Sequence, residues 1–275
     1  MRVQTSGSER AFRAVNYLFL ALLAIITLFP FYYVAMLSLG DPKPSLFFVV
    51  KVHVLHVHHY KAVFSEWGFR RALLISIARV VVGVALMVVI TGSAAFVLTK
   101  KNLKLRTPVI VFFLGAMFFS GGLIPTFMTL KTLGLLNSFW VLVLPSAFSI
   151  WTMIVMKMSF QSLPASMVEM ARVDGAHYVF IFFRIVLPLS KPMLAVLSTF
   201  HAVDLWNEWF AGAIYISNRK LKPLQTLLQS AIEGSSIATP RESAYVVVSI
   251  LPMVCLYAFI QKHLSKSMLV GATKA

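Results

Sequence analysis

The sequence has few charged residues and almost no cysteine, and both shortages narrow the class of protein. Charged residues make up 12% of the 275 residues, whereas hydrophobic residues make up 59%. An average soluble domain is about one quarter charged, so this chain has too little polar surface to cover itself in water. The one cysteine, Cys255, excludes an internal disulfide and any metal site built from cysteines. We therefore expect an integral membrane protein.

Acidic residues are scarce as well, with 9 Asp and Glu against 25 Lys and Arg and a formal net charge of +16. The basic residues do not form one patch; they lie between the apolar runs, which is typical of the loops of membrane proteins. This distribution argues against a nucleic-acid partner and favours membrane lipid. No secretory signal peptide is expected, because the apolar stretch after residue 13 is too long and lacks a cleavage site.

A nucleotide-binding loop is also missing. The sequence holds no G-x-x-x-x-G-K-[ST] motif and not even a Gly-Lys pair, so it cannot hold the phosphates of a nucleotide in a P-loop of its own. The apolar runs also lack the alternation typical of the strands of a membrane barrel.

Six apolar runs of about 20 residues predict six transmembrane helices in a single all-α domain over residues 1–275, because hydrogen-bonded helices satisfy the backbone in lipid. The expected spans are 14–39, 72–98, 107–130, 138–158, 193–217 and 245–259. The last run is the shortest, and we expect it to extend at both ends. Pro30, Pro145 and Pro252 lie inside spans, where neighbouring helices can satisfy the interrupted backbone.

The Lys and Arg residues between the spans favour a cytoplasmic position for both termini. With that orientation the inner segments hold 14 Lys and Arg and the outer segments hold 10, and Arg79 lies within the second span. The outer segments hold only four acids, which leaves a surplus of six positive charges on that side.

The connection between the fourth and fifth spans, residues 160–192, contains a short segment that is not a simple linker. Ser162 is a candidate N-cap, Pro164 suits a first helical turn, and Gly175 is placed to end the helix. The spacing predicts a short helix with mixed faces at the membrane surface. Periodicity alone favours an interfacial helix on lipid headgroups.

The amino-acid sequence of this segment resembles the E-A-A…D-G-A…I-x-L-P-x-x-x-P loop of ABC import permeases. Residues 169–176 read EMARVDGA and residues 185–192 read IVLPLSKP, with Met170 in place of the usual first alanine. Three further motifs, over residues 120–137, 206–210 and 261–274, resemble those of carbohydrate-uptake permeases. The chain thus resembles a permease subunit of a binding-protein-dependent type I importer, in the subgroup for oligosaccharides and polysaccharide fragments.

The resemblance implies an organisation and a set of partners. Such a subunit pairs with a related permease in the bacterial inner membrane, above two cytoplasmic ATPases that bind ATP and Mg. An extracytoplasmic solute-binding protein delivers the sugar, and the sugars of this subgroup include acidic ones such as alginate oligomers. The chain itself would then be no enzyme. Open alternatives are a permease for another class of small solute, a membrane enzyme, or a structural membrane subunit.

The resemblance also assigns a coupling role to four residues of the 160–192 loop. Small residues would allow the helix to enter a cleft on the ATPase, Glu169 would make a charge-assisted contact, and Gly175 would permit the following turn. The predicted coupling residues are Glu169, Ala171, Asp174 and Gly175.

Ionisable residues inside a span are functional candidates by default. On a helical wheel the polar residues of the fifth span share an arc of about 120°, and the aromatic residues occupy another arc. The pathway or substrate candidates are His201, Asp204, Trp206, Asn207, Glu208 and Trp209. Polar contacts between helices and an interfacial aromatic belt are the alternative. Arg79 is the best cationic partner for Asp204 or Glu208.

Four histidines in the first outer loop, at positions 53, 56, 58 and 59, raise the question of a metal site. No cysteine or acidic residue lies close enough in the sequence to complete a set of ligands. We expect an ordinary outer loop and no metal.

Overall fold

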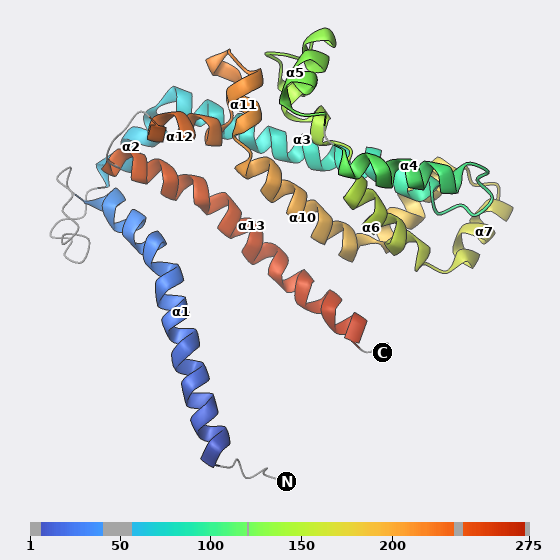
Figure 1. The fold of residues 1–275 in the computed structure, drawn as a ribbon, viewed down its shortest axis with the longest axis horizontal. Helices are drawn as coiled ribbons and strands as arrows, with labels where there is room; N and C mark the ends of the chain where they lie inside the picture. The colour runs from blue at the N-terminus through green and yellow to red at the C-terminus, as the bar shows by residue number, and fades with distance from the viewer. Residues whose placement is uncertain (1–6, 41–56, 120, 234–238, 273–275) are drawn as a thin grey trace. The chain divides into compact units, whose positions relative to one another are not determined.

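The computed structural model describes residues 7–40, 57–119, 121–233 and 239–272 (Figure 1). All regular elements within these ranges are helical. The chain divides into two compact units, one of Met1–Glu66 with Ser230–Ile250 and one of Trp67–Gln229 with Leu251–Ala275. The single domain over residues 1–275 stays a prediction.

The first unit contains α1 (Gly7–Leu39), α2 (His58–Ser65) and the beginning of α13 (Pro240–Ala272). The side chains of α1 are apolar and exposed around most of the helix, which a protein tolerates where lipid or another subunit covers them.

Hydrogen bonds join the elements of this unit to one another. Ser38 Oγ and the Tyr60 hydroxyl share one of 2.6 Å. The Glu66 carboxylate accepts from Arg241 at 2.9 Å and from the Tyr245 hydroxyl.

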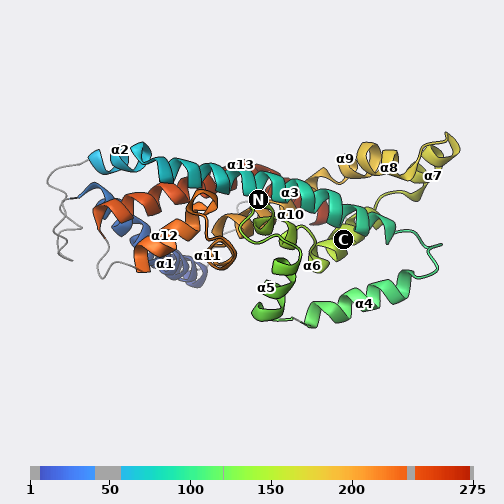
Figure 2. The same cartoon turned by 90° about the horizontal axis from the view of Figure 1, so that it is seen from above.

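The second unit is built along α3 (Trp67–Val97). Helices α6 (Ile150–Gln161) and α10 (Lys191–Asn207) pack against α3 and against each other (Figures 1 and 2). Glycines allow two of the closest approaches on α3: Gly83 faces Leu205 of α10, and Gly92 faces the ring of Phe182, 3.2 Å from where a Cβ would lie. Small residues at such crossings are typical of helix packing in membranes.

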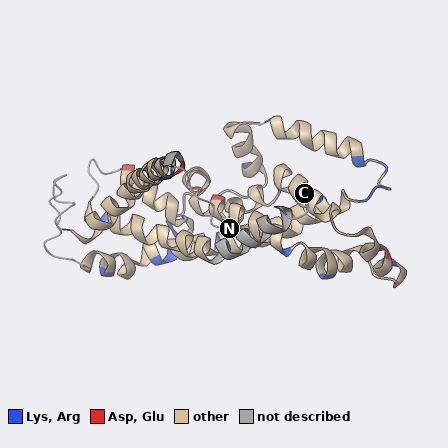
Figure 3. Ribbon diagram, turned by 90° about the horizontal axis from the view of Figure 1, so that it is seen from below, with Lys and Arg blue, Asp and Glu red and all other residues tan. Residues whose placement is uncertain are grey.

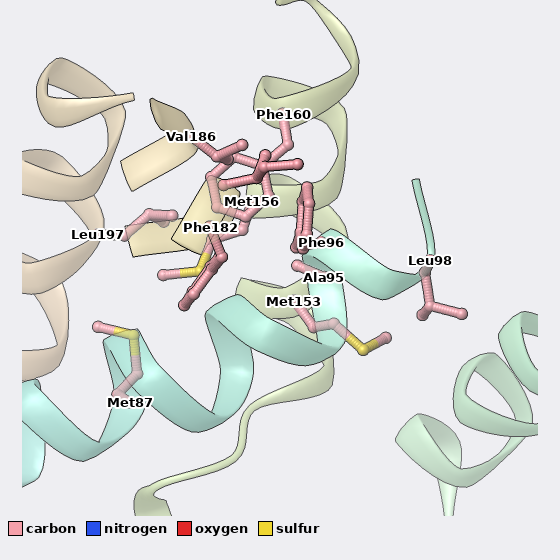
Figure 4. Close-up of a cluster of buried hydrophobic side chains, with 11 residues drawn as sticks. Met87, Ala95, Phe96, Leu98, Met153, Met156, Phe160, Phe182, Val186 and Leu197 are labelled. Atoms are coloured by element: carbon pink, nitrogen blue, oxygen red, sulfur yellow. The ribbon is translucent and has the colours of Figure 1, made fainter. Parts of the chain in front are cut away.

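A hydrophobic cluster joins the carboxyl-terminal half of α3 to α6, α10 and the segment after α7 (Figure 4). Its central residues are Met87, Phe96, Met156 and Phe182, which are buried. The rings of Phe96 and Phe182 lie with their centroids 5.7 Å apart. The cluster anchors the connection that contains the predicted coupling residues.

The second unit contains several shorter elements. They are α4 (Arg106–Phe118), α5 (Leu123–Thr132), the 3-10 helices η2 (Phe139–Leu142) and η3 (Leu144–Ser146), α7 (Ala165–Val173), α8 (Tyr178–Ile181), the π-helix η4 (Phe182–Val186), α9 (Leu187–Leu189), α11 (Phe210–Tyr215) and the 3-10 helix η5 (Arg219–Leu221). Helix α12 (Leu224–Glu233) begins in the second unit and ends in the first.

Among the described residues, three single helices are long and apolar enough to cross a membrane: Ala11–Leu39, Trp67–Val97 and Pro240–Ala258. Counting each of three bent helix pairs as one span raises the number to as many as six. Helix α13 extends beyond the predicted run 245–259 at both ends, whereas the candidate span within it, Pro240–Ala258, extends only toward the amino terminus. The predicted runs 107–130, 138–158 and 193–217 are each interrupted, so the prediction of one continuous helix for each of them was wrong.

Pro145 lies in η3, within the interrupted run 138–158. Here η2 and η3 precede α6 at an angle of 52°. Thr91 of α3 satisfies the backbone at this bend, since its Oγ1 donates to the Ala147 carbonyl at 2.9 Å and accepts from the Ser149 amide at 3.3 Å. A neighbouring helix therefore supports the bend.

Charged side chains are sparse along the ribbon (Figure 3). Most of the helical surface carries neither sign of charge, as expected for elements that contact lipid.

Candidate functional site

The fifth apolar run contains a break at Glu208 that the helical wheel did not predict. Helix α10 ends at Asn207, Glu208 is extended with φ −72° and ψ 111°, and α11 begins at Phe210. The cause is visible in the contacts of Glu208, whose Oε1 accepts from the Ala211 amide at 2.7 Å in the first turn of α11. The predicted arcs of residues 208–210 were therefore wrong, whereas those of residues 201–207 lie within a continuous helix.

Arg79 of α3 holds this break in place, in a set of contacts that we call the Arg79 junction. Its Nη1 donates to the Glu208 carbonyl at 2.8 Å, and its Nη2 donates to the Glu208 carboxylate. Its Nε donates to the carbonyl of Leu142 in η2 at 3.0 Å. The predicted pairing of Arg79 with Glu208 is confirmed. The guanidinium side chain is only 4% exposed, so one buried cation joins three elements.

Further hydrogen bonds tie the chain after Glu208 to the amino-terminal half of α3. Arg71 Nε donates to the Lys220 carbonyl at 2.8 Å, and Ser76 Oγ accepts from the Leu224 amide at 2.8 Å. Ser76 and Thr91 were not among the residues predicted for the site, although a polar residue within an apolar run is a signal for such contacts.

The other predicted pathway residues differ from one another in solvent exposure. Asp204 and Asn207 are exposed on α10, one turn apart, and His201 is half-buried. Within the described ranges, His201 Nε2 has no hydrogen-bond partner. Their roles in a pathway stay predictions.

The two tryptophans differ. Trp206 is only 3% exposed and packs among the helices, so it is not available to stack on a sugar ring in this conformation. Trp209 is exposed beside the break, with its ring edge-on to Phe210 at 5.8 Å.

Helix α7 lies in the predicted coupling loop, but it begins later than the sequence suggested. Pro164 is its N-cap and Ala165 its first residue, whereas Ser162 ends α6 as its C-cap. The predicted N-cap was therefore wrong, since the Ser162 amide still bonds to the Met158 carbonyl of α6.

The end of α7 agrees with the prediction at Gly175, which has a φ of +82°. The Gly175 amide donates to the Arg172 carbonyl at 3.1 Å, and the Ala176 amide donates to the Ala171 carbonyl at 2.9 Å. This pair of bonds is the Schellman motif, which requires a left-handed residue at the first position beyond the cap. Glycine adopts that conformation without a side-chain penalty.

Most of α7 is exposed. No residue of the helix is buried, and Val173 is 87% exposed. Glu169 and Asp174 are exposed as well, whereas Ala171 is half-buried and packs with Val168 against the hydrophobic cluster. One side of α7 thus attaches the helix, and the rest presents charged and apolar groups outward.

Beside α7 lies a cleft of about 720 Å³ that the sequence did not predict. Basic residues from two segments meet there, since Lys100 and Lys101 follow α3 and Arg172 is in the last turn of α7. The Arg172 guanidinium carbon lies 4.5 Å from the centre of the Tyr178 ring.

Two of the four histidines of the first outer loop lie in the part of the chain that the structure describes. His53 and His56 lie outside the described residues, and the rings of His58 and His59 lie with their centroids 3.8 Å apart. In the part of the chain that the structure describes, no three His, Cys, Asp or Glu residues are grouped so as to hold a metal ion.

Comparisons with known proteins define the class. The family of "Binding-protein-dependent transport system inner membrane component" matches residues 6–270. Protein LplC of Bacillus subtilis (strain 168) is 37% identical over 99% of this chain and 98% of its own length. The polygalacturonan/rhamnogalacturonan transport system permease protein YtcP of the same organism is 34% identical over 97% of this chain and 99% of its own length.

A solved structure agrees with these relatives. The crystal structure of a bacterial ABC transporter involved in the import of the acidic polysaccharide alginate superposes with a TM-score of 0.86, at 25% identity, over 94% of this chain and 98% of the other. The helices are thus arranged in the permease fold of a type I ABC importer. The chain belongs to the family of inner membrane components of binding-protein-dependent transport systems.

Proposed function

We propose that the chain is a sugar permease subunit of an ATP-driven importer in the bacterial inner membrane. It has six spans, three of them bent, with both termini in the cytoplasm. A related permease completes the pathway, two ATPases bind ATP and Mg on the cytoplasmic side, and a solute-binding protein delivers the sugar from outside. The observation that carries this proposal is the family match over residues 6–270 together with an exposed α7, capped at its carboxyl end, in the loop expected to contact the ATPases.

The coupling role of α7 follows from its shape. A helix with no buried residue has the surface to enter a cleft, and its Schellman end fixes the path of the chain into α8. Glu169 offers the charged contact, while the attached side of Ala171 transmits the movement to the hydrophobic cluster. ATP-driven movement of α7 would thereby reach α3, α6 and α10.

A transport assay tests the coupling role. Glu169→Lys, in the complex reconstituted with its ATPases and binding protein, should lower ATP-dependent uptake by about tenfold or more, as expected for losing a desolvated charged contact at an interface. Gln161→Lys adds positive charge to the exposed end of α6 without changing α7, and it should retain uptake. Equal uptake by both variants and the unchanged protein would reject the assignment of α7.

We propose further that the sugar is an anionic oligosaccharide. Arg70, Arg71, Arg219, Lys220 and Lys222 lie near one another in the second unit, because the Arg71 side chain bonds to the Lys220 carbonyl. Such a cluster raises the local concentration of an anion. Alginate, named as acidic in the solved structure, and polygalacturonan, named for YtcP, are consistent with this class.

Competition between sugars tests the anionic substrate. Replacing Arg219, Lys220 and Lys222 by Gln should weaken uptake of a uronate oligomer, with a smaller effect at high salt because salt screens exposed charges. Binding of the sugar-loaded binding protein should persist. If binding of that protein is lost instead, the cluster serves docking; if neutral oligomers are preferred, the anionic substrate is excluded.

A further inference from the structure

At the carboxyl end of α3 the structure contains an apolar groove that the proposed transport function does not use. Its volume is about 450 Å³, within the range of about 300–1,000 Å³ that is usual for small-molecule sites. Val89, Ser93 and Val97 line one wall, and Tyr178 and Phe183 line the other. None of the lining residues lies in α7, and the groove adjoins the cleft beside that helix through Lys100 and Tyr178, which line both.

The groove has the length and polarity of a site for a hydrocarbon chain. Val89 to Val97 spans eight residues of helix, or about 12 Å at 1.5 Å per residue. Val89, Val97 and Phe183 are exposed apolar side chains. Val89 and Val97 belong to α3, which is long and apolar enough to cross the membrane, whereas Phe183 belongs to η4. In a bilayer, lipid would therefore reach this wall.

The end of the groove beyond α3 is cationic. Lys100 belongs to its lining, and its Nζ lies 4.4 Å from the centre of the Phe96 ring and 5.0 Å from that of Tyr178. The Arg172 guanidinium lies 4.5 Å from the same Tyr178 ring. Within the described residues, neither cation has a carboxylate within salt-bridge distance. Two positive charges thus share one aromatic ring without an anion.

Electrostatics supports the need for an anion at this position. Burial, and secondly the positive charge of Arg172, lower the pKa of the Lys100 ammonium. A bound phosphate would stabilise the charged form and offset the repulsion between the two cations. Lys101 and Lys104 follow in the same loop but do not line the groove.

We propose that this groove binds an anionic phospholipid, with one acyl chain along α3 and the phosphate at Lys100. The site rests on the proposed function for its orientation, because the loop after α3 is cytoplasmic there and faces a leaflet that attracts basic residues. The bound lipid would fill the space between α3 and the segment that follows α7. It would be a structural ligand next to the moving part of the transporter.

Lipid retention by the purified complex tests the site. The full chain with its co-purifying subunits is equilibrated with mixed vesicles of phosphatidylglycerol and phosphatidylcholine in equal amounts, purified again, and its bound lipids are identified by native mass spectrometry. The unchanged protein should retain phosphatidylglycerol in preference to phosphatidylcholine. Lys100→Gln should lower that preference about fivefold, the effect of one interfacial cation.

Two further variants separate this site from general attraction to a basic loop. Lys104→Gln removes the same charge from the same loop outside the groove and should leave retention unchanged. Ser93→Phe fills the groove while keeping every cation and should lower retention of phosphatidylglycerol.

Three results would overturn the proposal: no preference in the unchanged protein, equal losses in Lys100→Gln and Lys104→Gln, or undiminished retention in Ser93→Phe. Retention is measured without sugar, ATP turnover or binding protein, so its failure is distinct from a failure of uptake.

Discussion

The Arg79 junction and helix α7 belong to the same unit but are held by different kinds of contact. At the junction, directional hydrogen bonds from one buried guanidinium fix the position of Glu208 and Leu142. Helix α7 has no buried residue and is attached through the packing of Val168 and Ala171 and by its capping bonds. The first arrangement fixes a geometry within the chain, whereas the second leaves most of the helix surface exposed, which is the surface that we propose contacts the ATPases. Mutations at the Arg79 junction should therefore lower the stability of the fold, whereas mutations in α7 should lower function.

The largest loss of stability is expected when the cation of the Arg79 junction is removed. Arg79→Gln leaves Glu208 and the Leu142 carbonyl without their donor, and should lower the free energy of unfolding by about 3 kcal/mol, as for other buried ion pairs that lose one partner. The Glu208 side chain is 36% exposed, which keeps the loss from being larger. Thermal unfolding of the purified protein measures it.

Arg70→Gln is the matched control, because Arg70 is an exposed residue at the start of the same helix. It should change stability by less than about 0.5 kcal/mol. Equal effects of the two substitutions would show that the junction does not stabilise the fold.

A second substitution separates packing from charge at the same place. Gly83 lies one turn beyond Arg79 and faces Leu205, so Gly83→Val would force α3 and α10 apart. Overpacking of this kind costs about 1–3 kcal/mol. Gly115→Ala in α4 meets no atom within 4 Å and should be neutral or stabilising in the same unfolding assay. A tolerated valine at position 83 would mean that hydrogen bonding alone holds the junction.

The smallest effect on stability is expected in the coupling segment. Gly175→Ala adds a Cβ at a φ of +82° with open space around it, so the cost is backbone strain of about 1 kcal/mol. Gly134→Ala is its match, with a φ of +67° and open space as well. Both variants should lose similar stability, but only Gly175→Ala should lower ATP-dependent uptake. Equal uptake in the two variants would contradict the role of the α7 end.

The sequence predicted where the apolar segments lie, the partner of Arg79 and the end of α7 at Gly175. These predictions depend on local properties: hydrophobic length, an isolated cation in an apolar run, and a glycine after a helix. The break at Glu208 was not predictable in the same way, because a helical wheel assumes a continuous helix. Here the side chain of Glu208 bonds to a backbone amide of the next helix, and a distant cation stabilises that arrangement.

The start of α7 shows the same limit on a smaller scale. Ser162 is a good N-cap residue, but α6 extends to Gln161 and uses it as a C-cap. Whether Ser162 ends α6 or begins α7 depends on how far α6 extends. The packing of α6 against α3 determines that length. Contacts at long range thus set the boundaries that composition leaves open.

The π-helix η4 has a consequence for chain length. A π turn holds one more residue than an α-helix needs for the same rise, so residues 182–186 contain one residue in excess. Removing that residue would restore an α turn and leave the faces of the flanking helices where they are. An insertion or deletion elsewhere in the continuous helical stretch of residues 178–189 would instead rotate the residues on either side of it relative to each other by about 100°. Among related permeases, variation in the length of this helical stretch is therefore expected to concentrate at this turn.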